Sequence, residues 1–283
     1  MTTPTTQHPI VVLGASGKTG RRIVERLRAR ALPVRPGSRS AHPPFDWEDP
    51  TTWAPALDGA SAAYVSYFPD LAAPGAPEAV AAVAKVAVEA GVDRLVLLSG
   101  RGEHEAQRSE EELRRSGATW TVVRSSWFAQ NFSEAHFRTP LLSGELALPA
   151  GEVGEPFIDA DDIADVAVAA LTEDGHAGQV YEVTGPRLLT FAQAVAEIAH
   201  ASGRELRYAP IGLDDFAAAL AQDGVPAEEV GLLRYLFTEV LDGRNAHVTD
   251  GVQRALGRPP RDFGAFARAA AATGAWDVTG VRA

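Results

Sequence analysis

The sequence of 283 residues contains no cysteine, so it can form neither disulfides nor thiolate nucleophiles, nor cysteine-ligated zinc or iron–sulfur sites. Long apolar runs are also missing, because no stretch approaches the roughly 20 residues that a membrane-spanning helix needs. Residues 1–8, MTTPTTQH, lack the charged and apolar regions of a signal peptide. We therefore expect a cytoplasmic protein with no bound metal and no membrane partner.

Positive charge is scarce, with 26 Lys and Arg against 37 Asp and Glu, which gives a net charge of −11. Such a balance argues against nucleic acid and anionic membranes as partners. The hydrophobic share of 46% is ordinary for a globular chain with a sizeable core. We expect a small-molecule substrate and a monomer or homodimer.

The most informative stretch is PIVVLGASGKTGRRIVERLRAR, residues 9–30. An apolar strand leads into three glycines and then into an amphipathic helix, which is how a Rossmann-type domain presents helix amides to a dinucleotide pyrophosphate. The alternative is a purely structural turn, since turns and caps also collect glycine. The expected pyrophosphate contacts are Gly14, Ser16, Gly17, Lys18, Thr19 and Gly20.

The residue about 20 positions beyond this loop distinguishes two dinucleotides. NAD-binding domains commonly carry an acidic residue there, on the adenosine ribose. Here Arg39 occupies the place, next to Ser38. An arginine beside hydroxyls would bind a 2′-phosphate, which favours NADP(H) over NAD(H); the alternative is a solvated loop arginine.

The rest of the chain predicts an α/β protein with a doubly wound parallel sheet and a smaller, mainly helical C-terminal substrate part. We expect residues 1–135 and 157–185 to form the NADP(H)-binding domain, and residues 136–156 and 186–283 to form the substrate-binding cap. The expected sheet strands are residues 9–13, 32–38, 45–47, 60–67, 92–99, 119–124 and 179–184. Helices are expected at residues 50–57, 77–90, 104–116, 159–171, 191–201, 213–222, 227–241, 248–256 and 262–273.

Polar and aromatic residues follow two of these strands. Asp46 and Trp47 would border the adenine, although an exposed Asp beside a packed Trp is the alternative. Ser66 and Tyr67 end the next strand, where open α/β sheets bind their ligands, and are further expected cofactor contacts.

Only some of the residues that usually manage the proton in a short-chain reductase are present. Ser99 stands where the usual serine would be, and we also count it among the cofactor contacts, but residues 100–117 contain neither tyrosine nor lysine. Ketone reduction creates an alkoxide that needs a general acid, whereas reduction of an iminium gives a neutral amine and needs none. The remaining donor candidates are Tyr67 and His104, each with a structural or solvated role as the alternative.

A cluster of aromatic and amide residues follows the strand at 119–124. We expect Trp127, Phe128, Asn131 and Phe132 to line a substrate pocket, with core packing as the alternative. The acidic run Glu110–Glu112 is expected on a solvated helix face.

These residues resemble the NmrA-like atypical short-chain dehydrogenases, in particular the branch of festuclavine dehydrogenase. The matching segments include LGASGKTG at 13–20, GSRS at 37–40, FDWEDPTTW at 45–53, SWFAQNFSE at 126–134 and FIDADDIADVA at 157–167. Two segments depart from the pattern, Val123–Ser125 and Ser66–Pro69, and both flank the expected pocket.

The resemblance implies an NADPH-dependent reductase without the Tyr-x-x-x-Lys pair, as in that branch's reduction of a cyclic iminium. A conjugated carbonyl is a further candidate substrate, and secondary metabolism a candidate setting. Two other hypotheses remain: a non-catalytic NADP(H)-sensing regulator, since the group includes such proteins, and a quinone- or azo-type reductase.

Overall fold

The structure is a computed structural model that describes residues 8–278. The chain folds into two compact units. Residues 8–125, 161–182 and 251–258 form the first, and residues 126–160, 183–250 and 259–278 form the second. Residues 126–135, 157–160 and 183–185, expected in the nucleotide-binding domain, lie in the second unit, whereas residues 251–258, expected in the cap, lie in the first.

The first unit is built on a six-stranded sheet in the order β2-β1-β3-β4-β5-β7. β1 pairs in parallel with β2 and β3, β3 with β4, and β4 with β5. The strands are β1 (Ile10–Leu13), β2 (Val34–Gly37), β3 (Ala62–Val65), β4 (Arg94–Gly100), β5 (Thr119–Ser125) and β7 (Gln179–Val183). Chain order reverses between β1 and β3, and ligands of open α/β sheets bind at such a switch point.

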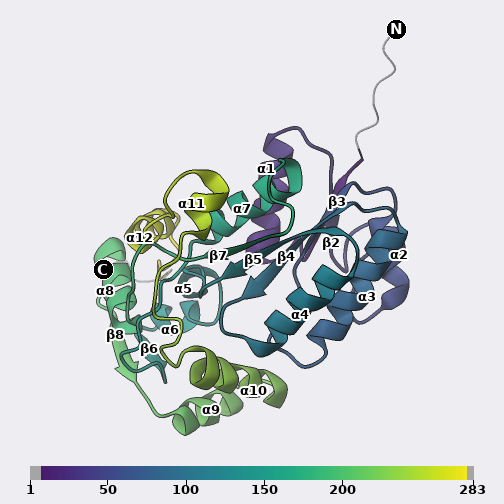
Figure 1. The fold of residues 1–283 in the computed structure, drawn as a ribbon. Coiled ribbons are helices and arrows are strands. Elements are labelled where there is room, and N and C mark those ends of the chain that lie inside the picture. The colour runs from purple at the N-terminus through teal and green to yellow at the C-terminus, as the bar shows by residue number, and fades with distance from the viewer. Residues whose placement is uncertain (1–7, 279–283) are drawn as a thin grey trace. The chain divides into compact units, whose positions relative to one another are not determined.

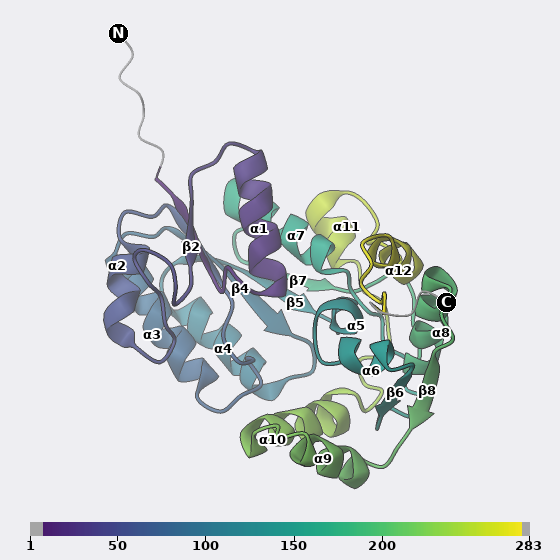
Figure 2. The same ribbon diagram turned by 180° about the vertical axis from the view of Figure 1, so that it is seen from behind.

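Helices cover both faces of this sheet. Figures 1 and 2 show α1 and α7 on one face and α2, α3 and α4 on the other. The helices of this unit are α1 (Lys18–Ala29), α2 (Trp53–Leu57), α3 (Ala76–Glu89), α4 (His104–Arg115), α7 (Ala160–Thr172) and α11 (Gly251–Leu256). β1 and β3 are apolar and buried along their whole length because both faces are covered. The parallel, doubly wound fold predicted from the sequence is confirmed.

The second unit is mainly helical, with one small parallel sheet of β6 (Glu145–Leu148) and β8 (Arg207–Pro210). Its helices are α5 (Asn131–Glu134), α6 (Arg138–Leu142), α8 (Phe191–Ser202), α9 (Leu213–Gln222), α10 (Ala227–Tyr235), a π-helix (Leu236–Val240) and α12 (Phe263–Ala272). Phenylalanines fill its core: the Phe132 ring centroid lies 5.3 Å from that of Phe157 and 5.5 Å from that of Phe263. β8 is a strand that the sequence did not predict.

The expectation of a sheet strand at residues 45–47 is wrong. That segment makes only an isolated bridge between Asp46 and Asp49, and the 3₁₀ helix Pro50–Thr52 follows. Local partners use its polar groups: the Asp46 carbonyl accepts from the Trp53 indole, and the Asp46 carboxylate accepts from the Glu48 amide. A backbone bonded in this way forms a turn, because these groups are no longer available to a sheet.

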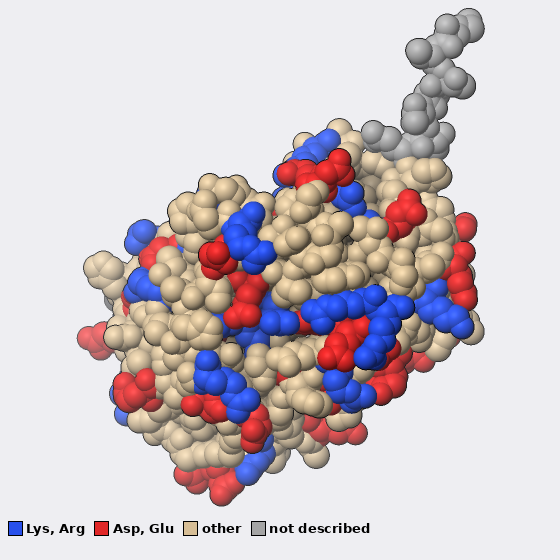
Figure 3. Space-filling view, viewed as in Figure 1, with Lys and Arg blue, Asp and Glu red and all other residues tan. Residues whose placement is uncertain are grey.

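No helix within residues 8–278 is both long and apolar enough to cross a membrane. On the face drawn in Figure 3, basic and acidic side chains lie next to one another rather than in separate patches of one sign. This mixture agrees with ion pairs such as those of Arg115 with Glu111 and Glu112.

Candidate functional site

The glycine loop joins β1 to α1 and is fixed to the end of β2. Gly14 has φ +77°, a left-handed conformation that favours glycine. The amides of Gly14 and Ala15 both donate to the Gly37 carbonyl, at 3.0 and 3.2 Å. The loop therefore holds one shape at the carboxyl edge of the sheet.

The same loop packs closely against the start of α1. A Cβ on Gly20 would lie 2.2 Å from the Gly14 carbonyl oxygen, so only glycine permits this close approach. Gly17 caps the helix without a side-chain hydrogen bond, and the first turn has no acidic residue. Helix amides that no cap covers, at the positive end of the dipole, favour an anion. The loop thus fits a dinucleotide pyrophosphate.

The three polar side chains of the loop point in different directions. Ser16 is exposed and Lys18 is half-buried. Thr19 is 3% exposed, and its hydroxyl accepts a hydrogen bond from the buried Tyr64 hydroxyl at 2.9 Å. Burial raises the pKa of Tyr64, so this hydroxyl keeps its proton. Thr19 therefore ties α1 to β3, while Ser16 and Lys18 lie at the start of the helix, where a phosphate would bind.

Arg39 follows the end of β2 and is exposed. Among residues 8–278 it has no hydrogen-bond or ion-pair partner, so its guanidinium is available to an anion. The Ser38 hydroxyl lies 3.3 Å from that of Ser40. This arrangement fits a phosphate on the adenosine ribose.

Trp47 links the turn after β2 to the end of β3. Its indole donates to the Ser66 carbonyl at 3.1 Å, and its ring meets the Tyr67 ring edge-on at 4.9 Å. The Ser66 side chain in turn lies 3.2 Å from the place of a Cβ on Gly14. Asp46, Trp47, Ser66 and Tyr67 therefore gather beside the glycine loop, as a shared ligand site requires.

The three candidate proton donors occupy unlike surroundings. Ser99 is 2% exposed, and its hydroxyl donates to Glu110 Oε1 at 2.7 Å. The His104 side chain is 77% exposed and lies 3.1 Å from the Glu105 carboxylate. Burial, together with the charges of Glu48 and Glu78, raises the pKa of Tyr67. Ser99 therefore has a structural partner, and His104 lies in solvent. The raised pKa keeps Tyr67 protonated.

A buried ion-pair network lies under the ends of β4, β5 and β7. Arg124 contacts both oxygens of Glu110 and also contacts Glu182. Arg101, 3% exposed, donates to Glu182 at 2.8 Å. The expectation that Glu110 lies on a solvated face is wrong, because Glu110 is fully buried. Its spacing from Ala106 and Leu113, both buried on the inner face of α4, was the available signal.

The expected substrate residues all belong to the second unit. Phe132 is fully buried, and its carbonyl accepts from the Trp276 indole at 2.8 Å, so it offers no surface to a substrate. Trp127, Phe128 and Asn131 are half-buried. The Trp127 ring stacks on Phe137 at 6.4 Å. These three keep partly open surfaces and stay predictions.

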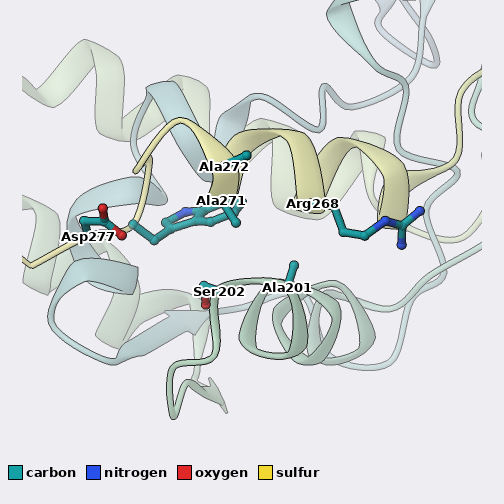
Figure 4. Close-up of a pocket in the computed structure, with 7 residues that line it drawn as sticks. Ala201, Ser202, Arg268, Ala271, Ala272 and Asp277 are labelled. Atoms are coloured by element: carbon teal, nitrogen blue, oxygen red, sulfur yellow. The ribbon is translucent and has the colours of Figure 1, made fainter.

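The second unit also contains a cavity of about 320 Å³ between α8 and α12. Figure 4 shows Ala201 and Ser202 on one side of it and Ala271 and Ala272 on the other, with the Arg268 side chain extending along α12. None of the residues expected to bind cofactor or substrate lines this cavity, so we do not assign it to the candidate site.

Comparison with known proteins agrees with the expectation that the chain binds a nicotinamide dinucleotide. Residues 14–174 match the model of a family described as NAD(P)H-binding. The chain belongs to this family, and its fold is NmrA-like. It is an NAD(P)H-dependent oxidoreductase.

Two relatives match nearly the whole chain. An NAD(P)H azoreductase of Xenophilus azovorans is 33% identical over 93% of this chain and 98% of its own length. Festuclavine dehydrogenase of Aspergillus fumigatus is 31% identical over 91% and 96%. The NADPH complex of a quinone oxidoreductase from Escherichia coli shares the fold, with a TM-score of 0.73 at 22% identity over 91% of this chain and 98% of that one.

Proposed function

We propose that this protein is an NADPH-dependent reductase that delivers hydride to a small conjugated acceptor, with a cyclic iminium or a conjugated carbonyl as the first choice. Bound NADPH supplies the hydride. The observation that carries the proposal is the pairing of a glycine loop open to a pyrophosphate with an exposed, unpaired Arg39 beyond β2.

The geometry of the first unit supports each proposed cofactor contact. The loop glycines, the helix amides, Ser16 and Lys18 would hold the pyrophosphate. Ser38 and Arg39 would hold the 2′-phosphate, and the Asp46–Trp47 turn would border the adenine. The preference for NADPH over NADH then depends on one cation, because a carboxylate at position 39 would repel the phosphate.

The surroundings of the candidate proton donors support the proposed acceptor class. Ser99 is committed to Glu110, and α4 carries no Tyr-x-x-x-Lys pair. An iminium needs no proton from the protein, and an enone can take its proton from solvent after hydride has arrived. The named activities of the relatives agree with this class, because azo compounds and quinones are also planar conjugated acceptors.

Turnover against a matched panel tests the proposal. We expect NADPH absorbance to fall with a cyclic iminium salt or a conjugated enone, and not with a saturated ketone of similar size. A quinone or azo dye reduced faster than both would move the acceptor to the quinone- or azo-type class. Binding of NADPH without turnover of any acceptor would contradict the enzyme proposal and favour a cofactor-sensing protein.

A further inference from the structure

The indole of Trp127 lacks the hydrogen bond that most tryptophans of this chain make. Of the five tryptophans, three donate from the indole to a backbone carbonyl, namely Trp47, Trp53 and Trp276. Trp127 is half-buried, yet within residues 8–278 its indole N–H has no partner and is not among the polar atoms closed off from solvent. Polar atoms in such partly buried positions usually find a partner, so this donor is open to a ligand.

Three phenylalanines hold the Trp127 ring in place. Its centroid lies 5.2 Å from that of Phe237, 5.7 Å from that of Phe191 and 6.4 Å from that of Phe137, with interplanar angles of 51°, 89° and 10°. All three phenyl rings are buried, with exposed fractions of 5% or less. Ring pairs of this kind attract one another beyond the burial of their surfaces, so the orientation of the indole is set before a ligand arrives.

The backbone of Trp127 is fixed as well. Its amide donates to Glu155 Oε1 at 3.2 Å, and its carbonyl accepts from the Ile158 amide at 2.9 Å. The neighbouring Phe237 belongs to the π-helix Leu236–Val240, and π-helical turns are rare and often found at functional sites. Trp127 therefore presents one open hydrogen-bond donor from a rigid aromatic support.

The chemistry of this donor distinguishes the two acceptors of the proposed function. An indole N–H only donates, so its partner must offer a lone pair. The oxygen of a conjugated carbonyl has lone pairs, whereas the nitrogen of an iminium has none. When hydride reaches the β-carbon of a conjugated carbonyl, the electron pair of the C=C bond moves toward the oxygen and gives an enolate, which then takes a proton from solvent. A hydrogen bond to that oxygen strengthens as its negative charge develops, so the donor stabilises the transition state.

We propose that Trp127 binds the acceptor, and that its indole N–H donates to the carbonyl oxygen of a planar conjugated carbonyl compound. The proposal rests on the proposed function and narrows its acceptor class from two candidates to one. The three phenylalanines are positioning residues, because they set the direction of the N–H.

Steady-state kinetics of the full chain with NADPH and two six-membered acceptors tests this assignment. Cyclohexenone, with its double bond conjugated to the carbonyl, is compared with the cyclic N-methyl tetrahydropyridinium ion, whose C=N bond carries the positive charge. Trp127→Phe keeps an aromatic ring and removes the N–H. Trp120→Phe is the matched control, because Trp120 is also half-buried but lies at the start of β5, at the opposite edge of the sheet.

The measured quantity is the ratio of kcat/KM for the enone to kcat/KM for the iminium, in which a general loss of packing cancels. We expect Trp127→Phe to lower this ratio about ten- to a hundredfold, the range for a lost hydrogen bond to a charged group, and mainly through kcat for the enone. The ratio should stay at the wild-type value in Trp120→Phe, and the affinity for NADPH should be the same in all three proteins. An unchanged ratio in Trp127→Phe would overturn the proposal, because the ring would then act through its shape alone.

A binding measurement on the wild type keeps the test decisive if Trp127→Phe does not fold. In the presence of NADP⁺, which has no hydride to give, acetophenone is compared by calorimetry with isopropenylbenzene, in which a methylene group replaces the oxygen. We expect acetophenone to bind about two- to tenfold more tightly, as one neutral hydrogen bond provides. Equal affinities of the wild type for the two compounds would refute the hydrogen bond.

Failure of this proposal differs from failure of the proposed function. Reduction of the iminium but not of the enone by the wild type would refute the carbonyl assignment and leave the reductase intact. Binding of NADPH without reduction of either acceptor would refute the proposed function and the role of Trp127 with it.

Discussion

The two ends of the carboxyl edge of the sheet use polar residues in opposite ways. Beside β1 and β2, Ser16 and Arg39 are exposed, and the start of α1 has no side-chain cap. Beside β4 and β5, Ser99 and Glu110 are buried and bonded to each other. The first end has donors without acceptors and suits an anionic ligand, whereas Ser99 and Glu110 at the second end are already bonded within the protein and suit a rigid support.

Two buried glutamates at the second end, Glu110 and Glu103, differ in their hydrogen-bond partners. Glu110 accepts hydrogen bonds from Ser99, Arg114 and Arg124. Glu103, seven positions earlier in the sequence, has an oxygen with no donor. Because both residues are buried, burial alone does not decide whether a carboxyl has hydrogen-bond partners; the neighbouring side chains do.

Of the changes considered, removing Glu110 should have the largest effect, and this effect is on the free energy of unfolding. Glu110→Ala leaves Arg124 with only Glu182, 3.4 Å away, and leaves the Ser99 hydroxyl without its acceptor. Losing one partner of a buried ion pair costs about 3 kcal/mol of unfolding free energy. Chemical denaturation measures this loss. Glu111→Ala, on the exposed face of the same helix, should change stability by less than about 0.5 kcal/mol; equal effects for both would show that the network is not a support.

Removing Arg39 should have the next largest effect, and on binding rather than on stability. Arg39→Ala loses a charge-assisted contact to the 2′-phosphate, worth about 1.5–2 kcal/mol, or roughly ten- to thirtyfold in affinity. We expect NADPH binding to weaken by that factor while NADH binding is unchanged, as measured by calorimetry. Arg28→Ala, another exposed arginine, serves as the control. Equal affinities of the wild type for NADPH and NADH would refute the 2′-phosphate role.

The sequence alone predicted the strand, glycine loop and helix at the β1 end of the sheet edge well, because these features are local. An apolar strand, a glycine loop and an amphipathic helix follow one another within residues 9–30, and each follows from short-range physical chemistry. Arg39 could also be proposed from the sequence, since its proposed role depends on its distance along the chain from the loop. The helix bounds were close for the same reason; for example, α9 spans Leu213–Gln222 as expected.

What sequence could not predict depends on partners far along the chain. The ion-pair partner of Glu110 is Arg124 on the next strand, and Thr19 turns inward because Tyr64 donates to it from β3. The segment 45–47 reads as a strand until the Trp53 indole takes the Asp46 carbonyl. Glu103 gave no signal at all, since its environment exists only once the ends of β3 and β4 lie side by side.

Removing the Ser99 hydroxyl should have the smallest effect, and this prediction tests the comparison most directly. Ser99→Ala deletes one donor to Glu110, but Arg124 still donates to the same oxygen at 2.8 Å, so the loss should be about 1 kcal/mol. Turnover with the iminium or enone substrate should stay within a few-fold of the wild type.

A proton donor in the reaction would behave differently, because removing a general acid costs about 10²–10⁴ in rate. Ser125→Ala is the matched control: Ser125 is a buried serine at the end of the adjacent strand, paired in register with Gly100. If Ser99→Ala lost a hundredfold in turnover at unchanged stability while Ser125→Ala did not, the hydroxyl would belong to the reaction. The β4 end of the edge would then be part of the active site rather than its support.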